Sequence, residues 1–223
     1  MPRIITILLL LAITLAAPFL LRPKEDAEQA SYKNAERLVI ITPHNESIRA
    51  EFQRAFVRYM KDEHNREVFI DWRQPGGTSE ITKFIKSEST NAFGNLWKKE
   101  TGKSFNLKIR DAFTNSRLDE TASDDEKAAR ALYLSSEAGI GIDLFFGGGA
   151  YDFSKQASAG TLVPQDPSGR FGPTALAKER PEWFSDAVMP AKVSGEPFRD
   201  EEMRWVGTVL SAFGMCYNDD SLE

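Results

Sequence analysis

Three short stretches place polar or glycine residues directly after apolar runs, an arrangement in which a ligand site can form. They are residues 42–46 (TPHNE), 73–79 (RQPGGTS) and 146–151 (FGGGAY). Each is followed by the expected start of a helix. Glycines let a ligand approach the backbone closely, and free amides at a helix N-terminus favour anions. The candidate ligand-binding residues are Thr42, His44, Asn45, Glu46, Gly76, Gly77, Thr78, Ser79, Gly147, Gly148, Gly149 and Tyr151.

His44 is the candidate with the most chemistry, because an imidazole can accept, donate or ligate a metal. It is one of only two histidines in the chain. Together with Glu46 it would suit a hard or borderline cation, and His44 is the one candidate metal ligand. The alternatives stay open. A lone histidine in a turn is usually structural or exposed, a carboxylate is favoured in the first turn of any helix, and Gly-Gly pairs are often only turns.

Enzyme chemistry is not expected from this sequence. It contains no Ser-His-Asp order, no paired metal ligands and no phosphate-binding loop. The glycines of "GIGIDLFFGGG" surround an expected strand, which is not the order of a dinucleotide-binding fingerprint. A hydrolase using His44 and Glu46 is the weakest alternative, because no nucleophile is matched to His44. We therefore expect no catalytic residues and no cofactor.

The composition indicates a globular protein that does not bind nucleic acid. The chain has 223 residues, of which 41% are hydrophobic, and a formal net charge of −5. Phosphate binding requires a basic footprint, and no basic stripe is present. The single cysteine, Cys216, excludes an internal disulfide and a cysteine-rich metal cluster.

The elements that would position the candidate site form a parallel α/β pattern. A continuous apolar run over residues 37–42 predicts a buried strand. A helix should follow, with Ile48, Phe52, Ala55, Phe56 and Tyr59 on one face. A second strand over 66–72 completes a strand-helix-strand crossover unit within about 35 residues. Because parallel strands end at the same edge of a sheet, the three candidate stretches should lie together.

Further along the chain, Thr78 should open a helix. The capping box Ser123–Glu126 should open another, with Gly139 as its C-cap. Residues 90–122 are assigned to helix plus irregular connection. The remaining expected elements are a third strand over 140–146, a helix over 151–159, a brief strand over 161–164, a helix around 175–180 and a strand or strand pair over 205–218.

The first 22 residues resemble an export signal or a membrane anchor, because the uncharged run of residues 4–21 is flanked by Arg3 and Arg22. Residues 23–36 are charged and rich in small residues, and we interpret them as a tether. The protein is therefore expected to be exported to the periplasm or another extracytoplasmic space. It would stay anchored to the membrane if the leader is not cleaved.

The ordered segments resemble the solute-binding proteins of bacterial ABC importers, in the two-lobed type II class related to ferric-iron, polyamine and phosphonate binders. The resemblance rests on "LVIITPHNESIRAEFQRAF", "VFIDWRQPGGTSEITKFI", "GIDLFFGGGAYDFSKQASAGTLVP" and "WVGTVLSAFGMCYND". It implies a periplasmic-binding-protein type II-like fold with a mainly parallel sheet flanked by helices. Residues 37–204 would form the first lobe, and 205–223 a hinge-crossing strand toward a second lobe that this fragment lacks.

The resemblance also implies a function. The protein would capture a small solute, such as iron, a small anion or a polyamine-type ligand, and deliver it to an ABC permease and ATPase complex. Ferric iron would then be a transported ligand and not a cofactor. A membrane-tethered sensor domain of a signalling protein is the alternative. The sequence after Glu223 would discriminate the two, since a second lobe indicates transport and a transmembrane helix with a signalling domain indicates sensing.

Overall fold

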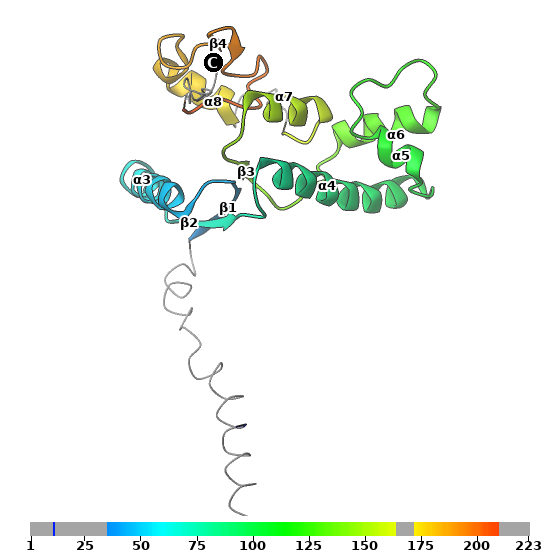
Figure 1. The fold of residues 1–223 in the computed structure, drawn as a ribbon, viewed down its shortest axis with the longest axis horizontal. Helices are drawn as coiled ribbons and strands as arrows, with labels where there is room; N and C mark the ends of the chain where they lie inside the picture. The colour runs from blue at the N-terminus through cyan, green and yellow to red at the C-terminus, as the bar shows by residue number, and fades with distance from the viewer. Residues whose placement is uncertain (1–10, 12–34, 164–171, 210–223) are drawn as a thin grey trace, which may run out of the picture. The chain divides into compact units, whose positions relative to one another are not determined.

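The computed structural model describes Leu11, residues 35–163 and residues 172–209 (Figure 1). These residues fall into two compact units. The first comprises 35–38 and Glu46–Asp71, and the second comprises Val39–Asn45 and the described residues from Trp72 onward. The leader over 1–22 apart from Leu11, residues 23–34 of the tether expected over 23–36, and the segment from 210 therefore lie outside the described residues. Glu36, the last residue of the expected tether, already belongs to the first strand. No helix in the described part of the chain is long and apolar enough to cross a membrane.

A small parallel sheet of three strands organises the chain, as the sequence predicted. Its strands are β1 (Glu36–Ile41), β2 (Val68–Arg73) and β3 (Leu144–Phe145), in the order β2-β1-β3. Ile40 and Ile41 pair in parallel with Leu144 and Phe145. The backbone amides of Glu36 and Thr42 donate to the carbonyls of Glu67 and Arg73, so β1 and β2 also run in the same direction. A mixed α/β architecture with a parallel sheet and helices is thereby confirmed.

The helix that joins β1 to β2 has the expected position. Helix α3 (Glu46–His64) contains the whole predicted apolar face. None of its residues is fully buried, and Ile48 and Phe52 are 37% and 43% exposed. Within the same unit, Arg66 forms an ion pair with Glu36 and Arg37 forms one with Asp71.

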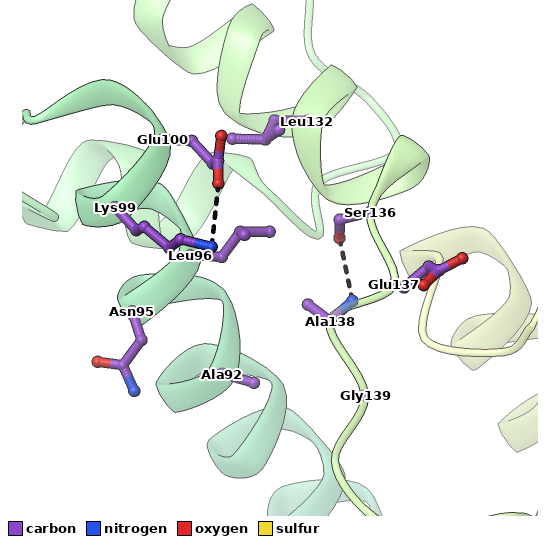
Figure 2. Close-up of a pocket in the computed structure, with 10 residues that line it drawn as sticks. All are labelled: Ala92, Asn95, Leu96, Lys99, Glu100, Leu132, Ser136, Glu137, Ala138 and Gly139. Carbon is purple, nitrogen blue, oxygen red and sulfur yellow. Dashed lines mark hydrogen bonds and ion pairs between the residues drawn. The ribbon is translucent and has the colours of Figure 1, made fainter.

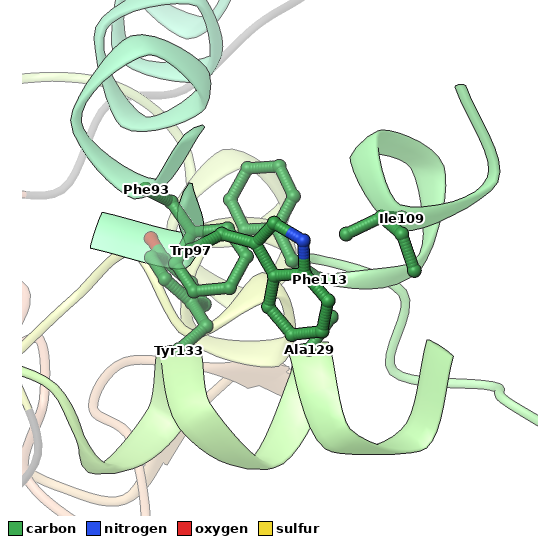
Figure 3. Packing of buried hydrophobic residues seen from close by; sticks show 6 residues of the cluster. All are labelled: Phe93, Trp97, Ile109, Phe113, Ala129 and Tyr133. Carbon is green, nitrogen blue, oxygen red and sulfur yellow. The ribbon is translucent and has the colours of Figure 1, made fainter. Parts of the chain in front are cut away.

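Helix α4 (Thr78–Thr101) begins where the sequence predicted and continues into the region 90–122, which we assigned to helix plus irregular connection. It packs with α5 (Leu107–Ala112) and α6 (Asp124–Ser135) around a hydrophobic core that is separate from the one at the sheet, where Ile81 and Ile85 of α4 pack with Ile41 (Figures 1 and 3). This helical core consists of Phe93, Trp97, Ile109, Phe113, Ala129 and Tyr133. Phe93 and Phe113 stack with ring centroids 4.8 Å apart, and Tyr133 meets both rings edge-on. Residues 90–122 thus contain helix, in α4 and α5, and irregular connections at 102–106 and 113–122, as the sequence predicted.

Two boundaries differ from the prediction because side chains bind the backbone. Helix α6 ends at Ser135 and not at Gly139. The Ser136 hydroxyl donates to the Tyr133 carbonyl and accepts from the Ala138 amide, which competes with further helical turns. The third strand shortens to Leu144–Phe145 because the Asp143 carboxylate accepts the Val39 amide hydrogen at 2.7 Å. That side chain takes the place of a ladder hydrogen bond.

The last part of the described chain is made of short elements. Helix α7 (Ala150–Ala159) starts one residue before its predicted position and ends as expected. The brief strand over 161–164 is not present at 161–163, and residue 164 lies outside the described residues.

The expected helix near residue 175 is α8 (Gly172–Glu179), followed by the 3-10 helix η1 (Pro181–Phe184). Strands β4 (Lys192–Val193) and β5 (Glu196–Pro197) pair as a hairpin. Of the strand expected over 205–218, the described part holds only a bridge between Val206 and Arg199.

Candidate functional site

Three loops meet at the carboxyl edge of the sheet, within the second compact unit. The ladder continues to the strand ends, because the Thr42 amide donates to the Arg73 carbonyl and the Phe146 amide donates to the Ile41 carbonyl, each at 2.9 Å. The loops that leave these ends cover residues 42–45, 73–78 and 146–149. We call this arrangement the strand-end site. The sequence predicted that these stretches would lie together, and the contacts below place them side by side.

His44 lies at the centre of the strand-end site. Its backbone amide donates to the Thr42 hydroxyl at 3.2 Å, and its carbonyl accepts from the Gln74 side-chain amide at 2.9 Å. The half-buried ring meets Phe146 edge-on, with ring centroids 5.0 Å apart. Among the described residues, the imidazole itself has no hydrogen-bond partner. Neither ring nitrogen is therefore committed to a hydrogen bond within the described part of the chain.

Two glycines bring the third loop against the other two. Gly147 has φ +93°, and a Cβ atom there would lie 2.5 Å from Nε2 of His44. Gly148 has φ +142°, and its Cβ would lie 3.5 Å from Cγ2 of Thr78. Both the backbone conformation and the close approach of the His44 ring require glycine at position 147. These two positions are thus more than ordinary turn glycines.

The helix N-termini at the site carry their own carboxylates. Helix α4 follows its N-cap Gly77, and the Glu80 side chain folds back toward Gly76 and Gly77. Helix α7 follows its N-cap Gly149, whose amide donates to Oδ2 of Asp152 at 3.3 Å. A carboxylate in the first turn is favoured by the helix dipole and partly neutralises it. Free amides were expected at both ends, so these internal anions weaken the case for an anionic ligand.

The remaining candidates occupy the rim or belong elsewhere. Thr42 is fully buried, and its hydroxyl accepts a hydrogen bond from the His44 amide. Asn45 and Ser79 are exposed, and Tyr151 is 77% exposed at the second residue of α7. Glu46 begins α3, which belongs to the first compact unit, so it is not placed against the strand-end site. Four further residues that contact the site are not among the individual candidates: Gln74 and Phe146, which lie within the candidate stretches, and Glu80 and Asp152, which follow them. An acidic residue three positions after the helix N-cap glycine was the signal for two of them.

A metal centre gains no support from the side chains. The described residues contain no group of three or more His, Cys, Asp or Glu that could hold a metal ion. His44 therefore remains a metal ligand by expectation only.

A groove of about 610 Å³ lies away from the strand-end site, between α4, α6 and the extended segment after α6 (Figure 2). Its lining residues are Ala92, Asn95, Leu96, Lys99, Glu100, Leu132, Ser136, Glu137, Ala138 and Gly139. Leu96 and Leu132 also pack against the helical core. None of the lining residues belongs to the three loops.

Comparison with known proteins does not identify a family. The chain matches no protein-family model, and searches of curated proteins and of solved structures gave no match. The geometry of the strand-end site is thus the basis for a functional proposal.

Proposed function

We propose that this chain is an exported substrate-binding component of an ABC importer, which captures a small solute at the strand-end site and delivers it to a membrane permease. The observation that carries the proposal is the His44 imidazole, which has no hydrogen-bond partner among the described residues. It is held where three loops meet, by Gln74 and Thr42 through its backbone. In open parallel sheets, ligands bind beyond the carboxyl ends of the strands.

The surroundings of His44 support binding over catalysis. Phe146 packs edge-on against the ring, and Trp72 lies 6.4 Å from Phe146 between ring centroids. Ligand sites commonly combine such apolar walls with a few polar groups that fix orientation. The hydroxyl of Thr42, which could otherwise serve as a nucleophile, belongs to a fully buried residue and accepts from the His44 amide. The proposed role is therefore recognition of one solute without turnover.

The solute classes are a ferric or other transition-metal ion, a small inorganic anion and a polyamine. The carboxylates of Glu80 and Asp152 at the helix N-termini favour a cationic solute over an anion. Isothermal titration of the 223-residue chain with ferric citrate, inorganic phosphate and spermidine tests the proposal. We expect saturable binding of one class, and binding should be lost or weakened at least about tenfold in His44→Ala, equivalent to about 1.4 kcal/mol.

The matched control is His64→Ala, which removes the other histidine from the end of α3. It should leave the affinity unchanged. The proposal is wrong if His44→Ala binds as well as the unchanged chain, or if none of the three solutes binds to a chain that circular dichroism shows to be folded.

A further inference from the structure

Arg130 in α6 is a partly buried cation whose partners are all backbone carbonyls. Its guanidinium donates to Phe113 at 2.9 Å, to Ser158 at 2.8 Å and to Ala159. No carboxylate pairs with it among the described residues. Burial lowers the pKa of Arg130 from its usual value, because desolvation disfavours the charged form. Since these carbonyls belong to two separate segments of the chain, the guanidinium joins them.

Two of these carbonyls belong to the last turn of α7. The final carbonyls of a helix lack partners within the helix, and a cation is favoured beside them. The next residue, Gly160, has φ +80°, and a Cβ there would lie 2.6 Å from Cδ2 of Leu134 and 3.2 Å from Nη1 of Arg130. The positive φ favours glycine at this position, and its lack of a side chain leaves room for Leu134 and Arg130 of α6 beside the end of α7. The third carbonyl is that of Phe113, the C-cap residue of α5, so the same guanidinium also contacts the end of α5.

The other end of α7 forms part of the strand-end site. The helix begins at Ala150, directly after the glycine loop that contacts His44 and Thr78. Ten helical residues span about 15 Å as a rigid rod. A constraint on the last turn therefore sets the direction of the helix, and with it the position of Gly147 and Gly148.

We propose that Arg130 is a positioning residue that holds α7, and through it the glycine loop of the strand-end site, against the module of α4, α5 and α6. The helical module then acts as a support for the site. That Arg130 supports ligand binding rests on the proposed function. That Arg130 positions α7 and the glycine loop does not depend on any ligand.

Histidine NMR of the ligand-free chain tests this inference, because only His44 and His64 contribute ring signals. In Arg130→Met, we expect the His44 ring signals to shift by more than their line width while those of His64 remain. Arg130→Lys keeps the charge but presents a single nitrogen in place of the planar fork, so it should give a smaller shift in the same direction. The control is Arg110→Met, which removes an exposed arginine of α5 from the same module. It should leave both histidines unchanged.

Unchanged His44 signals in folded Arg130→Met would overturn the inference, as would an equal shift in Arg110→Met. If Arg130→Met does not fold, Arg130→Lys decides by the same readout. Failure of the solute titration leaves the NMR comparison valid. The failure of the proposed function and the failure of this inference are therefore distinguishable.

Discussion

At the carboxyl edge of the sheet, His44 and Gly147 meet because a glycine leaves room for an imidazole. The ring packs edge-on against Phe146, and the backbone of Gly147 lies where any side chain would collide with Nε2 of His44. Gln74 fixes the His44 backbone from the neighbouring loop. The position of one titratable ring is thus determined by contacts from two other loops.

Gly147→Ala should displace His44. The positive φ costs about 1–2 kcal/mol for an L-residue, and the steric conflict with the ring adds to this. Gly141→Ala is the matched control, because Gly141 has φ +70° and no atom within 4 Å of its would-be Cβ. We expect both variants to lose stability in urea unfolding, with the larger loss at position 147. Only Gly147→Ala should shift the His44 ring signals in NMR, and equal behaviour of the two variants would contradict the packing described here.

At the scale of single elements, the N-terminus of α6 is stabilised by the capping box that the sequence predicted. The Glu126 carboxylate accepts from the Ser123 hydroxyl and from the Ser123 amide at 2.9 Å, which completes the predicted capping box. The side-chain hydrogen bond from Ser123 is the main cause that lowers the pKa of Glu126, and the backbone hydrogen bond lowers it further. The cap therefore makes α6 sensitive to acid.

The sign of this dependence follows from the lowered pKa. The carboxylate stabilises the folded state above the unfolded-state pKa of Glu126, and this contribution is lost as the pH falls through the folded-state pKa. Glu126→Gln should therefore have a smaller loss of thermal midpoint between about pH 6 and pH 3 than the unchanged chain. Glu137→Gln, which removes the same charge after the end of α6, serves as the control. An unchanged acid dependence in Glu126→Gln would show that the cap does not titrate in this way.

At the scale of the whole molecule, one helix contributes to both hydrophobic cores of the second unit. Ile81 and Ile85 of α4 pack with Ile41 in the sheet core, and Phe93 and Trp97 of the same helix belong to the helical core. Because α4 is one continuous helix of 24 residues, unfolding of one core would also destabilise the other. We therefore expect the sheet and the helical module to unfold together.

Phe93→Ala should lower the stability of this unit by about 3–5 kcal/mol, because it removes a fully buried ring that contacts four other aromatic side chains. Amide hydrogen exchange should accelerate by similar factors in β1 and α6, as expected for one cooperative transition. Leu107→Ala, at a side chain that is 68% exposed in the same module, should change stability by less than about 0.5 kcal/mol. Faster exchange in α6 alone would separate the two cores into independent units.

The sequence by itself determined the features that depend on neighbours along the chain. It located β1, α3, β2 and the start of α4, because strand-length apolar runs and helical periodicity are local patterns. It also located the capping box of α6, and it placed the three candidate loops at one edge through the rule for parallel strands.

Only the tertiary structure decided the features that depend on distant partners. Helix α4 extends to Thr101 because Phe93 and Trp97 find aromatic partners far along the chain. The third strand shrinks to Leu144–Phe145 because the Asp143 side chain binds β1. The role of Gly147 depends on the His44 ring, which is remote in sequence and adjacent in space. Packing and side-chain hydrogen bonds between distant residues leave no periodic pattern, which is why the sequence could indicate where the site lies but not what holds it.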